Sequence, residues 1–149
     1  MTDPAERATR GRVLGIDLGS RRIGVALSDP TRTVASPLEV LERQRTHADD
    51  HRAIFALARE HDAGTVVVGL PLSLSGDTGP AARAVLAEVD EMKAAAPGTV
   101  AVEVFDERLT TVTAERSLRE ARMRREARRR VVDKVAAAVM LQAYIEAHA

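Results

Sequence analysis

The sequence is poor in several residue types, and each scarcity narrows what the protein can do. It contains no cysteine, which excludes disulfide bridges, thiolate metal sites and a cysteine nucleophile. It also has no tryptophan, and its aromatic side chains are limited to Phe55, Phe105 and Tyr144. Bases are therefore not expected to stack on an aromatic platform. A bound nucleic acid would be recognised through its backbone and shape.

Long hydrophobic runs are missing as well. No apolar stretch approaches the roughly 18 residues that a membrane span requires. The N-terminal stretch MTDPAERATRGR is polar and lacks the apolar centre of a signal peptide. We therefore expect no membrane partner and a cytoplasmic location. Residues 1–11 are predicted to form a flexible tail, and residues 12–149 have the length of a single domain.

The apolar pattern predicts an α/β fold. In chain order, the expected elements are strands at 13–18, 22–28 and 33–40, a helix at 51–61, a strand at 65–70, a helix at 80–95, a strand at 100–105 and a helix at 131–147. The tight GSRR turn should join the first two strands as a hairpin. Pro37 marks the third strand as an edge strand, because proline cannot donate to an interior ladder. This β-β-β-α-β-α-β-α order predicts a mixed five-stranded sheet flanked by helices.

Carboxylates occur at positions where structure alone would not place them. Asp17 interrupts an apolar strand, and burying its charge is costly without compensation. Asp106 and Glu107 follow the last strand directly. Asp133 starts an apolar stripe on the final helix, whose members are Ala136, Ala137, Met140, Leu141 and Tyr144. The three alanines at 136–138 should let that helix lie close to the sheet.

Each acidic residue has a structural explanation when taken alone. Asp17 could accept hydrogen bonds from the turn at 19–20, Asp133 could interact with a helix N-terminus, and Glu107 could pair with a nearby arginine. Three carboxylates brought together would repel one another unless a cation lay between them. Oxygen ligands suit Mg²⁺ or Mn²⁺. The combination of Asp17, Glu107 and Asp133, with Asp106 as a substitute for Glu107, therefore predicts a divalent metal site.

Positive charge is concentrated near the C-terminus, although the chain is neutral overall. Residues 116–134 carry eight arginines and one lysine against three acidic residues. Arg122, Arg124, Arg125 and Arg128 are the predicted contacts to nucleic acid phosphates. A solvated surface is the alternative, because only Lys93 and Lys134 among the 22 basic residues are lysine and arginine is thus favoured throughout.

Two further motifs are ambiguous or weak. The loop containing Ser73, Ser75 and Gly76 precedes a predicted helix, and it could offer backbone N–H groups to a phosphate or be an ordinary connection. His47 and His51 lie four residues apart. The zinc-protease motif requires Glu after the first histidine, and this chain has Ala48 there. We expect these histidines on a solvent-facing helix surface.

Four stretches together resemble the YqgF/RuvX family of the RNase H-like superfamily. They are GIDLGSRRIGVALSD (15–29), VVVGLPLSLSGDTG (66–79), FDERLTT (105–111) and VDKVAAAVMLQAY (132–144). The resemblance implies an RNase H-like fold and Mg²⁺- or Mn²⁺-dependent hydrolysis of phosphodiester bonds. It also implies a role in maturing the 5′ end of precursor 16S ribosomal RNA or, through the relation to RuvC, in resolving Holliday junctions. Structured RNA or branched DNA would be the partner.

The resemblance assigns catalytic roles to three positions. Asp17 matches the first-strand aspartate, Glu107 the acidic residue of the DER motif, and Asp133 the aspartate of the final helix. Related nucleases place a carboxylate at the end of the fourth strand, where this chain has Gly69-Leu70-Pro71. The DER carboxylate would substitute from the adjacent strand. The mechanism would follow a two-metal scheme, in which one ion activates water and the other stabilises the leaving oxygen.

Two other functional classes compete with the nuclease. GIDLGS also resembles the first phosphate loop of actin-like and sugar-kinase-type phosphotransferases, but those proteins clamp nucleotide between two such domains, and 149 residues supply one. A catalytically inactive nucleic-acid-binding adaptor is the second, and the missing fourth-strand carboxylate favours it. The sequence does not indicate an oligomeric state.

Overall fold

The computed structural model describes residues 11–71, 78–106 and 125–149, and for residues 125–132 and 134 only the helical backbone. Its elements, in order, are β1 (Arg12–Leu18), β2 (Arg22–Ser28), β3 (Ala35–Glu42), α2 (His47–Glu60), β4 (Ala63–Leu70), α3 (Pro80–Ala95), β5 (Ala101–Asp106) and α5 (Arg125–Ala147). This order of described elements confirms the predicted succession of strands and helices.

The five strands form one mixed sheet in the order β3-β2-β1-β4-β5. The pairs β1–β2 and β2–β3 are antiparallel, whereas β1–β4 and β4–β5 are parallel. The predicted hairpin is present, and its turn is closed by the backbone N–H of Gly19, which donates to the carbonyl of Arg22 at 2.9 Å. The strand that contains Pro37 lies at the edge, as expected.

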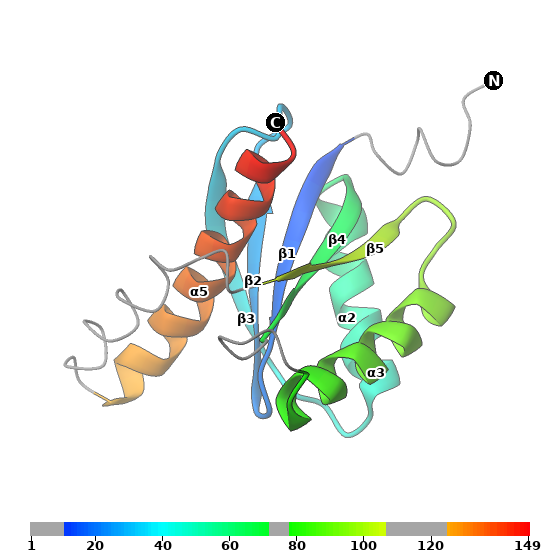
Figure 1. Cartoon of the computed structure of the whole chain (residues 1–149), viewed down its shortest axis with the longest axis vertical. Coiled ribbons are helices and arrows are strands. Elements are labelled where there is room, and N and C mark those ends of the chain that lie inside the picture. Colours follow the sequence, from blue (N-terminus) through cyan, green and yellow to red (C-terminus); the bar gives the residue numbers. More distant parts are fainter. Residues whose placement is uncertain (1–10, 72–77, 107–124) are drawn as a thin grey trace.

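Helices cover both faces of the sheet (Figure 1). Helix α5 packs on one face across β1, β2 and β3, and α2 and α3 pack on the other. The core on the α5 side includes Val13, Ala26, Val67, Phe105, Ala137, Leu141 and Tyr144. The core on the α2 and α3 side includes Leu14, Ile16, Ile23, Ile54, Val66, Val68, Val89 and Met92. The central strands β1 and β4 are thus buried on both faces, which explains their nearly continuous apolar sequences.

Two helices begin earlier than the apolar pattern predicted. Helix α2 begins at His47 because the hydroxyl of Thr46 accepts a hydrogen bond from the Asp49 N–H at 3.1 Å, which caps the helix. Helix α5 begins at Arg125 rather than at residue 131, since arginine, glutamate and alanine are good helix formers even without an apolar stripe. Over the described residues, no helix combines the length and apolar character needed to cross a membrane.

Candidate metal and nucleic-acid site

Asp17 lies on the α5 face of the sheet, one residue before the end of β1. Side chains alternate along this strand: Leu14 and Ile16 join the core beneath α2 and α3, whereas Val13 joins the α5 core. Burial raises the pKa of Asp17 from its ordinary value of 3.8 to about 6, and the nearby carboxylate of Asp133 raises it as well. The charged form of Asp17 is therefore disfavoured in the absence of a cation, and a cation would be favoured beside it.

Asp133 reaches the site because α5 lies directly on strand backbone. A Cβ built on Gly24, the residue that pairs with Asp17 across β1 and β2, would come within 2.2 Å of the backbone oxygen of Asp133. A Cβ on Gly15 would come within 2.9 Å of the Cβ of Leu141. The three alanines at 136–138 were expected to allow this close approach. Gly15 and Gly24 on the strands also allow α5 to approach the sheet closely. Glycine inside a predicted strand was the sequence feature that indicated this close approach.

The position of Asp133 along its helix corrects one expectation. Because α5 begins at Arg125, Asp133 lies more than two turns inside the helix rather than at its start. An interaction with the helix N-terminus falls off within the first turn, so it does not account for this residue. The side chain is partly exposed, and it lies near enough to Asp17 for its charge to raise the pKa of that residue.

Arg22 is a component of the site that the sequence pattern did not predict. Its Nε donates to Oδ2 of Asp133 at 3.0 Å. The two side chains adjoin a cavity of about 370 Å³ that is also lined by Gly19, Ser20 and Arg21. The signal available in the sequence was the doubled arginine, Arg21 and Arg22, in the hairpin turn that follows Asp17. The hairpin thus brings positive charge to the edge of the acidic site.

Of the two acidic residues at the end of the last strand, only Asp106 belongs to the described part of β5. Phe105 belongs to the α5 core, whereas Val104 packs against the core on the other face. Asp106 pairs with Leu70, which also packs on that other side. Alternation therefore places Asp106 on the face opposite Asp17, which argues against it as the substitute ligand. Glu107 lies outside the described residues.

No set of three histidine, aspartate or glutamate residues that could hold a metal ion is found in the described ranges. These ranges contribute a pair, Asp17 and Asp133, to the candidate site. Strand β4, from Ala63 to Leu70, contains no acidic residue, so this strand contributes no carboxylate to the described part of the site. The pair supplies only oxygen donors, as Mg²⁺ or Mn²⁺ requires, and its mutual repulsion fits a site completed by a cation.

A buried ionic network fixes the hairpin next to Asp17. The Nε of Arg43 donates to the carbonyl of Gly19 at 2.9 Å. Its two terminal nitrogens donate to both oxygens of Glu88 at 2.7 and 2.9 Å, and one of them also donates to Asp50 at 3.0 Å. One side chain thereby links the turn after β1 to both α2 and α3.

The histidine pair on α2 differs from its expected placement. His51 is buried, and its Nε2 lies 2.8 Å from Oε2 of Glu88. His47 is more exposed, with its Nδ1 2.7 Å from Oε2 of Glu91. The expectation of a solvent-facing surface is therefore wrong for His51. Helix α3 covers that side of α2, and this tertiary contact leaves no mark in the local sequence.

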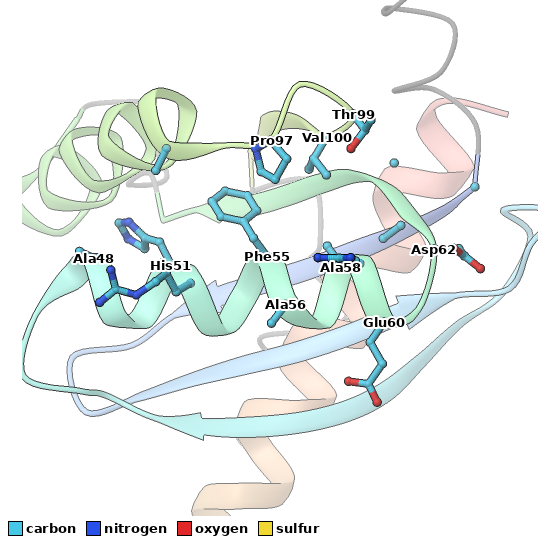
Figure 2. A pocket seen from close by; sticks show the side chains of 16 residues that line it. Ala48, His51, Phe55, Ala56, Ala58, Glu60, Asp62, Pro97, Thr99 and Val100 are labelled. Atoms are coloured by element: carbon cyan, nitrogen blue, oxygen red, sulfur yellow. The ribbon is translucent and has the colours of Figure 1, made fainter.

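Another cavity, larger than the one beside Asp133, does not contain the acidic site. It has a volume of about 1290 Å³ and lies beside α2, with Phe55, Pro97 and Val100 among its lining residues (Figure 2). It adjoins the N-terminal ends of β1 and β4, near Gly11 and Ala63. Ligands of open α/β sheets bind beyond the carboxyl ends of the strands, where Asp17 lies. The smaller cavity beside Asp133 is therefore the better candidate site.

The predicted phosphate contacts belong to parts of the chain whose side chains the structure does not describe. Ser73, Ser75 and Gly76 lie outside the described residues, as do Arg122 and Arg124. Arg125 and Arg128 belong to the first turns of α5, where only the backbone is described.

Comparisons with known proteins agree with this architecture. A relative from Nocardia farcinica (strain IFM 10152), named "Putative pre-16S rRNA nuclease", is 43% identical over 149 residues, which cover 97% of this chain and 82% of the relative. A relative of the same name from Roseiflexus sp. (strain RS-1) is 44% identical over 138 residues, which cover 91% of this chain and 94% of the relative.

The solved structure "T. thermophilus RuvC in complex with Holliday junction substrate" matches with a TM-score of 0.56 and 18% identity. The match covers 93% of this chain and 96% of that one, and it shows that the two share the RNase H-like fold. Residues 11–147 match the family model described as "RuvX: Holliday junction resolvase". Together with the curated relatives, this match shows that the chain belongs to the RuvX family.

Proposed function

We propose that this protein is a metal-dependent nuclease that hydrolyses phosphodiester bonds in the 5′-end maturation of precursor 16S rRNA. The observation that carries the proposal is the partly buried Asp17, whose pKa is raised by desolvation and by Asp133, at the carboxyl end of a strand that pairs in parallel with β4. The assignment of precursor 16S rRNA as the substrate is supported by membership of the RuvX family and by relatives named as pre-16S rRNA nucleases. Such a substrate places the protein in the cytoplasm.

Asp17, Glu107 and Asp133 are the proposed ligands of Mg²⁺ or Mn²⁺. When bound, two such ions would supply an activated water and stabilise charge on the leaving oxygen. The chain itself positions the carboxylates: β1 holds Asp17 in a partly buried position, and the contact of α5 with Gly24 fixes the height of Asp133 above the sheet. Because Asp106 faces the other side of the sheet, the neighbouring Glu107 is the better third ligand.

Contacts to the nucleic acid are proposed for two segments that lie between Asp17 and Asp133 in the sequence. Arg122, Arg124, Arg125 and Arg128 would neutralise backbone phosphates, and this interaction weakens as salt is added. The loop with Ser73, Ser75 and Gly76 precedes α3 and would offer backbone N–H groups to a phosphate. With few aromatic residues available, recognition rests on the shape of a structured RNA.

Holliday junction resolution is the second candidate function. The description of the matching family and the shared fold with RuvC favour it. Paired symmetric cuts would require a dimer, so the oligomeric state in solution bears directly on this alternative. A catalytically inactive adaptor is the third candidate, favoured by the absence of a carboxylate from β4.

A cleavage assay distinguishes these functions. Purified protein is incubated with Mg²⁺ or Mn²⁺ and either a precursor 16S rRNA fragment or a four-way DNA junction. We expect cleavage of the RNA that is lost in Asp17→Asn and Glu107→Gln but retained in Asp106→Asn, the matched neighbour on the other face. Preferential cleavage of the junction would favour the resolvase. Binding without cleavage of either substrate would favour the adaptor, and undiminished cleavage by Asp17→Asn would exclude this site.

A further inference from the structure

Arg22 holds a distinctive position in the acidic site. It begins β2 on the same hairpin that carries Asp17, and its backbone carbonyl closes the hairpin turn by accepting from Gly19. Its side chain is 22% exposed and that of Asp133 is 29% exposed, so the 3.0 Å contact between them is only partly screened by water. The guanidinium is therefore held where the hairpin and α5 meet.

The contact uses an atom that a metal ion would also require. Nε of Arg22 donates to Oδ2 of Asp133, one of the few carboxylate oxygens available in the candidate site. Asp133 is also the carboxylate that raises the pKa of Asp17, so the two acids repel each other. With no metal present, the single positive charge of Arg22 offsets part of this repulsion.

A divalent cation and the guanidinium cannot share this position without cost. Both are positive, and both seek the same lone pairs on Asp133. A cation that binds between Asp17 and Asp133 would repel a guanidinium that stayed in contact with Oδ2. Because arginine remains protonated at any ordinary pH, loss of a proton cannot relieve this conflict. The side chain must move away instead.

We propose that Arg22 is an internal counter-ion that occupies Asp133 in the metal-free protein and competes with the divalent metal for this carboxylate. Arg22 thereby sets the metal affinity of the site without being a ligand itself. This inference deepens the proposed function and rests on the metal requirement stated there. Metal binding and release of Arg22 from Asp133 are coupled, so removing the arginine tightens metal binding.

Arg21 provides a matched control. It precedes Arg22 in the sequence and lines the same cavity, but it is exposed, and within the described part of the chain it forms no ion pair with a carboxylate. Substituting either arginine by glutamine removes one positive charge from the same hairpin. Only the substitution at Arg22 removes the contact with Asp133.

The test is calorimetric titration of Mn²⁺ into the full-length protein and its variants. Arg22→Gln is expected to bind Mn²⁺ roughly five-fold more tightly than the wild type. This factor corresponds to about 1 kcal/mol, the energy of one partly exposed ion pair that the metal no longer has to break. Arg22→Lys keeps the charge and should remain close to the wild type. Arg21→Gln should change the affinity less than about two-fold, since exposed charges are screened. Circular dichroism establishes that each variant is folded.

Unchanged or weaker Mn²⁺ binding by Arg22→Gln would overturn the proposal, as would equal tightening in Arg21→Gln. Either result, obtained while Asp17→Asn abolishes Mn²⁺ binding, would leave the proposed nuclease site intact. If the wild type does not bind Mn²⁺ at all, both the competition and the metal requirement of the proposed function fail. Melting temperatures provide independent support. In EDTA, Arg22→Gln should melt at a lower temperature than the wild type. Mn²⁺ should then raise the melting temperature of the variant by more than it raises that of the wild type.

Discussion

Gly24 and Asp133 are in direct backbone contact: the oxygen of Asp133 lies 2.2 Å from the point where a Cβ on Gly24 would stand. Gly24 pairs with Asp17, so this single contact sets how far the two carboxylates lie from each other across the β1–α5 interface. The glycine serves close packing rather than an unusual backbone conformation. The acidic site therefore depends on a residue that has no side chain to contribute.

Gly24→Ala tests this dependence. The added methyl group meets a backbone oxygen, which cannot rotate away, so α5 must shift from the sheet. We expect a loss of about 1–3 kcal/mol in the free energy of unfolding, measured by urea denaturation. Mn²⁺ affinity should fall with it, since Asp133 moves relative to Asp17.

Gly98→Ala is the control for that substitution. A Cβ at Gly98 meets nothing within 4 Å, so this variant should leave both stability and Mn²⁺ affinity near the wild type. A Gly24→Ala protein with unaltered stability would show that α5 does not lie as close to β2 as the structure indicates.

Asp17→Asn is expected to stabilise the metal-free protein. The pKa of Asp17 in the folded state is about 6, above its unfolded value of 3.8, because of burial and the charge of Asp133. The folded state thus binds the proton of Asp17 more tightly than the unfolded state does. The free energy of unfolding therefore decreases as the pH rises from about 4 through 6. In EDTA at pH 8 the variant should be about 1–3 kcal/mol more stable than the wild type, given 1.36 kcal/mol per pKa unit.

The comparison variant is Asp90→Asn, which removes an exposed carboxylate from α3 and should leave the pH dependence of stability unaltered. Adding Mn²⁺ should make the wild type more stable than Asp17→Asn, because the metal stabilises the wild type and leaves the variant unaffected. If Asp17→Asn proves less stable than the wild type in EDTA, its carboxylate contributes to folding through hydrogen bonds instead.

Much of the fold could be predicted because local pattern and tertiary structure agree. The strand at 22–28 and the helix at 80–95 have the predicted bounds, since turn residues and Pro80 mark their ends. Pro37 correctly marked an edge strand. The start of α5 was missed because its first turns lack the apolar periodicity by which helices were identified.

The candidate site was predictable only in its acidic residues. Asp17 and Asp133 stood out because charge is costly in apolar surroundings, and the structure places them close enough to interact. Arg22 could not be assigned, since its partner is more than a hundred positions away in the sequence. The choice between Asp106 and Glu107 also required the fold: the sides on which Val104 and Phe105 pack decide the side of Asp106.

Glu88→Gln should destabilise the protein at neutral pH. Burial alone would raise the pKa of Glu88, but hydrogen bonds from Arg43 and His51 outweigh it and lower the pKa below the usual value of 4.5. A lowered pKa means that the charged carboxylate stabilises the folded state above that value, and that this contribution disappears as the pH falls through it. We expect a loss of about 1–3 kcal/mol at pH 7 by urea denaturation, since Arg43 loses its main partner.

The difference between Glu88→Gln and the wild type should narrow below pH 4.5, where the wild-type carboxylate also becomes neutral. Glu91→Gln removes a carboxylate from the same helix that pairs with His47 at an exposed position, so its effect should stay below about 0.5 kcal/mol. Equal losses from the two variants would mean that the buried network around Arg43 contributes no more than an exposed ion pair.

The double variant Arg124→Gln/Arg125→Gln tests the proposed contact of the basic segment with nucleic acid. Each lost phosphate contact releases one fewer counterion, so the slope of log affinity against log salt should become shallower by about one to two. Affinity is measured by fluorescence anisotropy with a labelled precursor 16S rRNA fragment, in EDTA to prevent cleavage. Arg52→Gln/Arg59→Gln provides the control, because these exposed arginines line the large cavity at the opposite ends of the parallel strands. The same charge change there should leave the slope unaltered. A shallower slope in both double variants would indicate attraction by overall charge alone, because only local phosphate contacts distinguish the two positions.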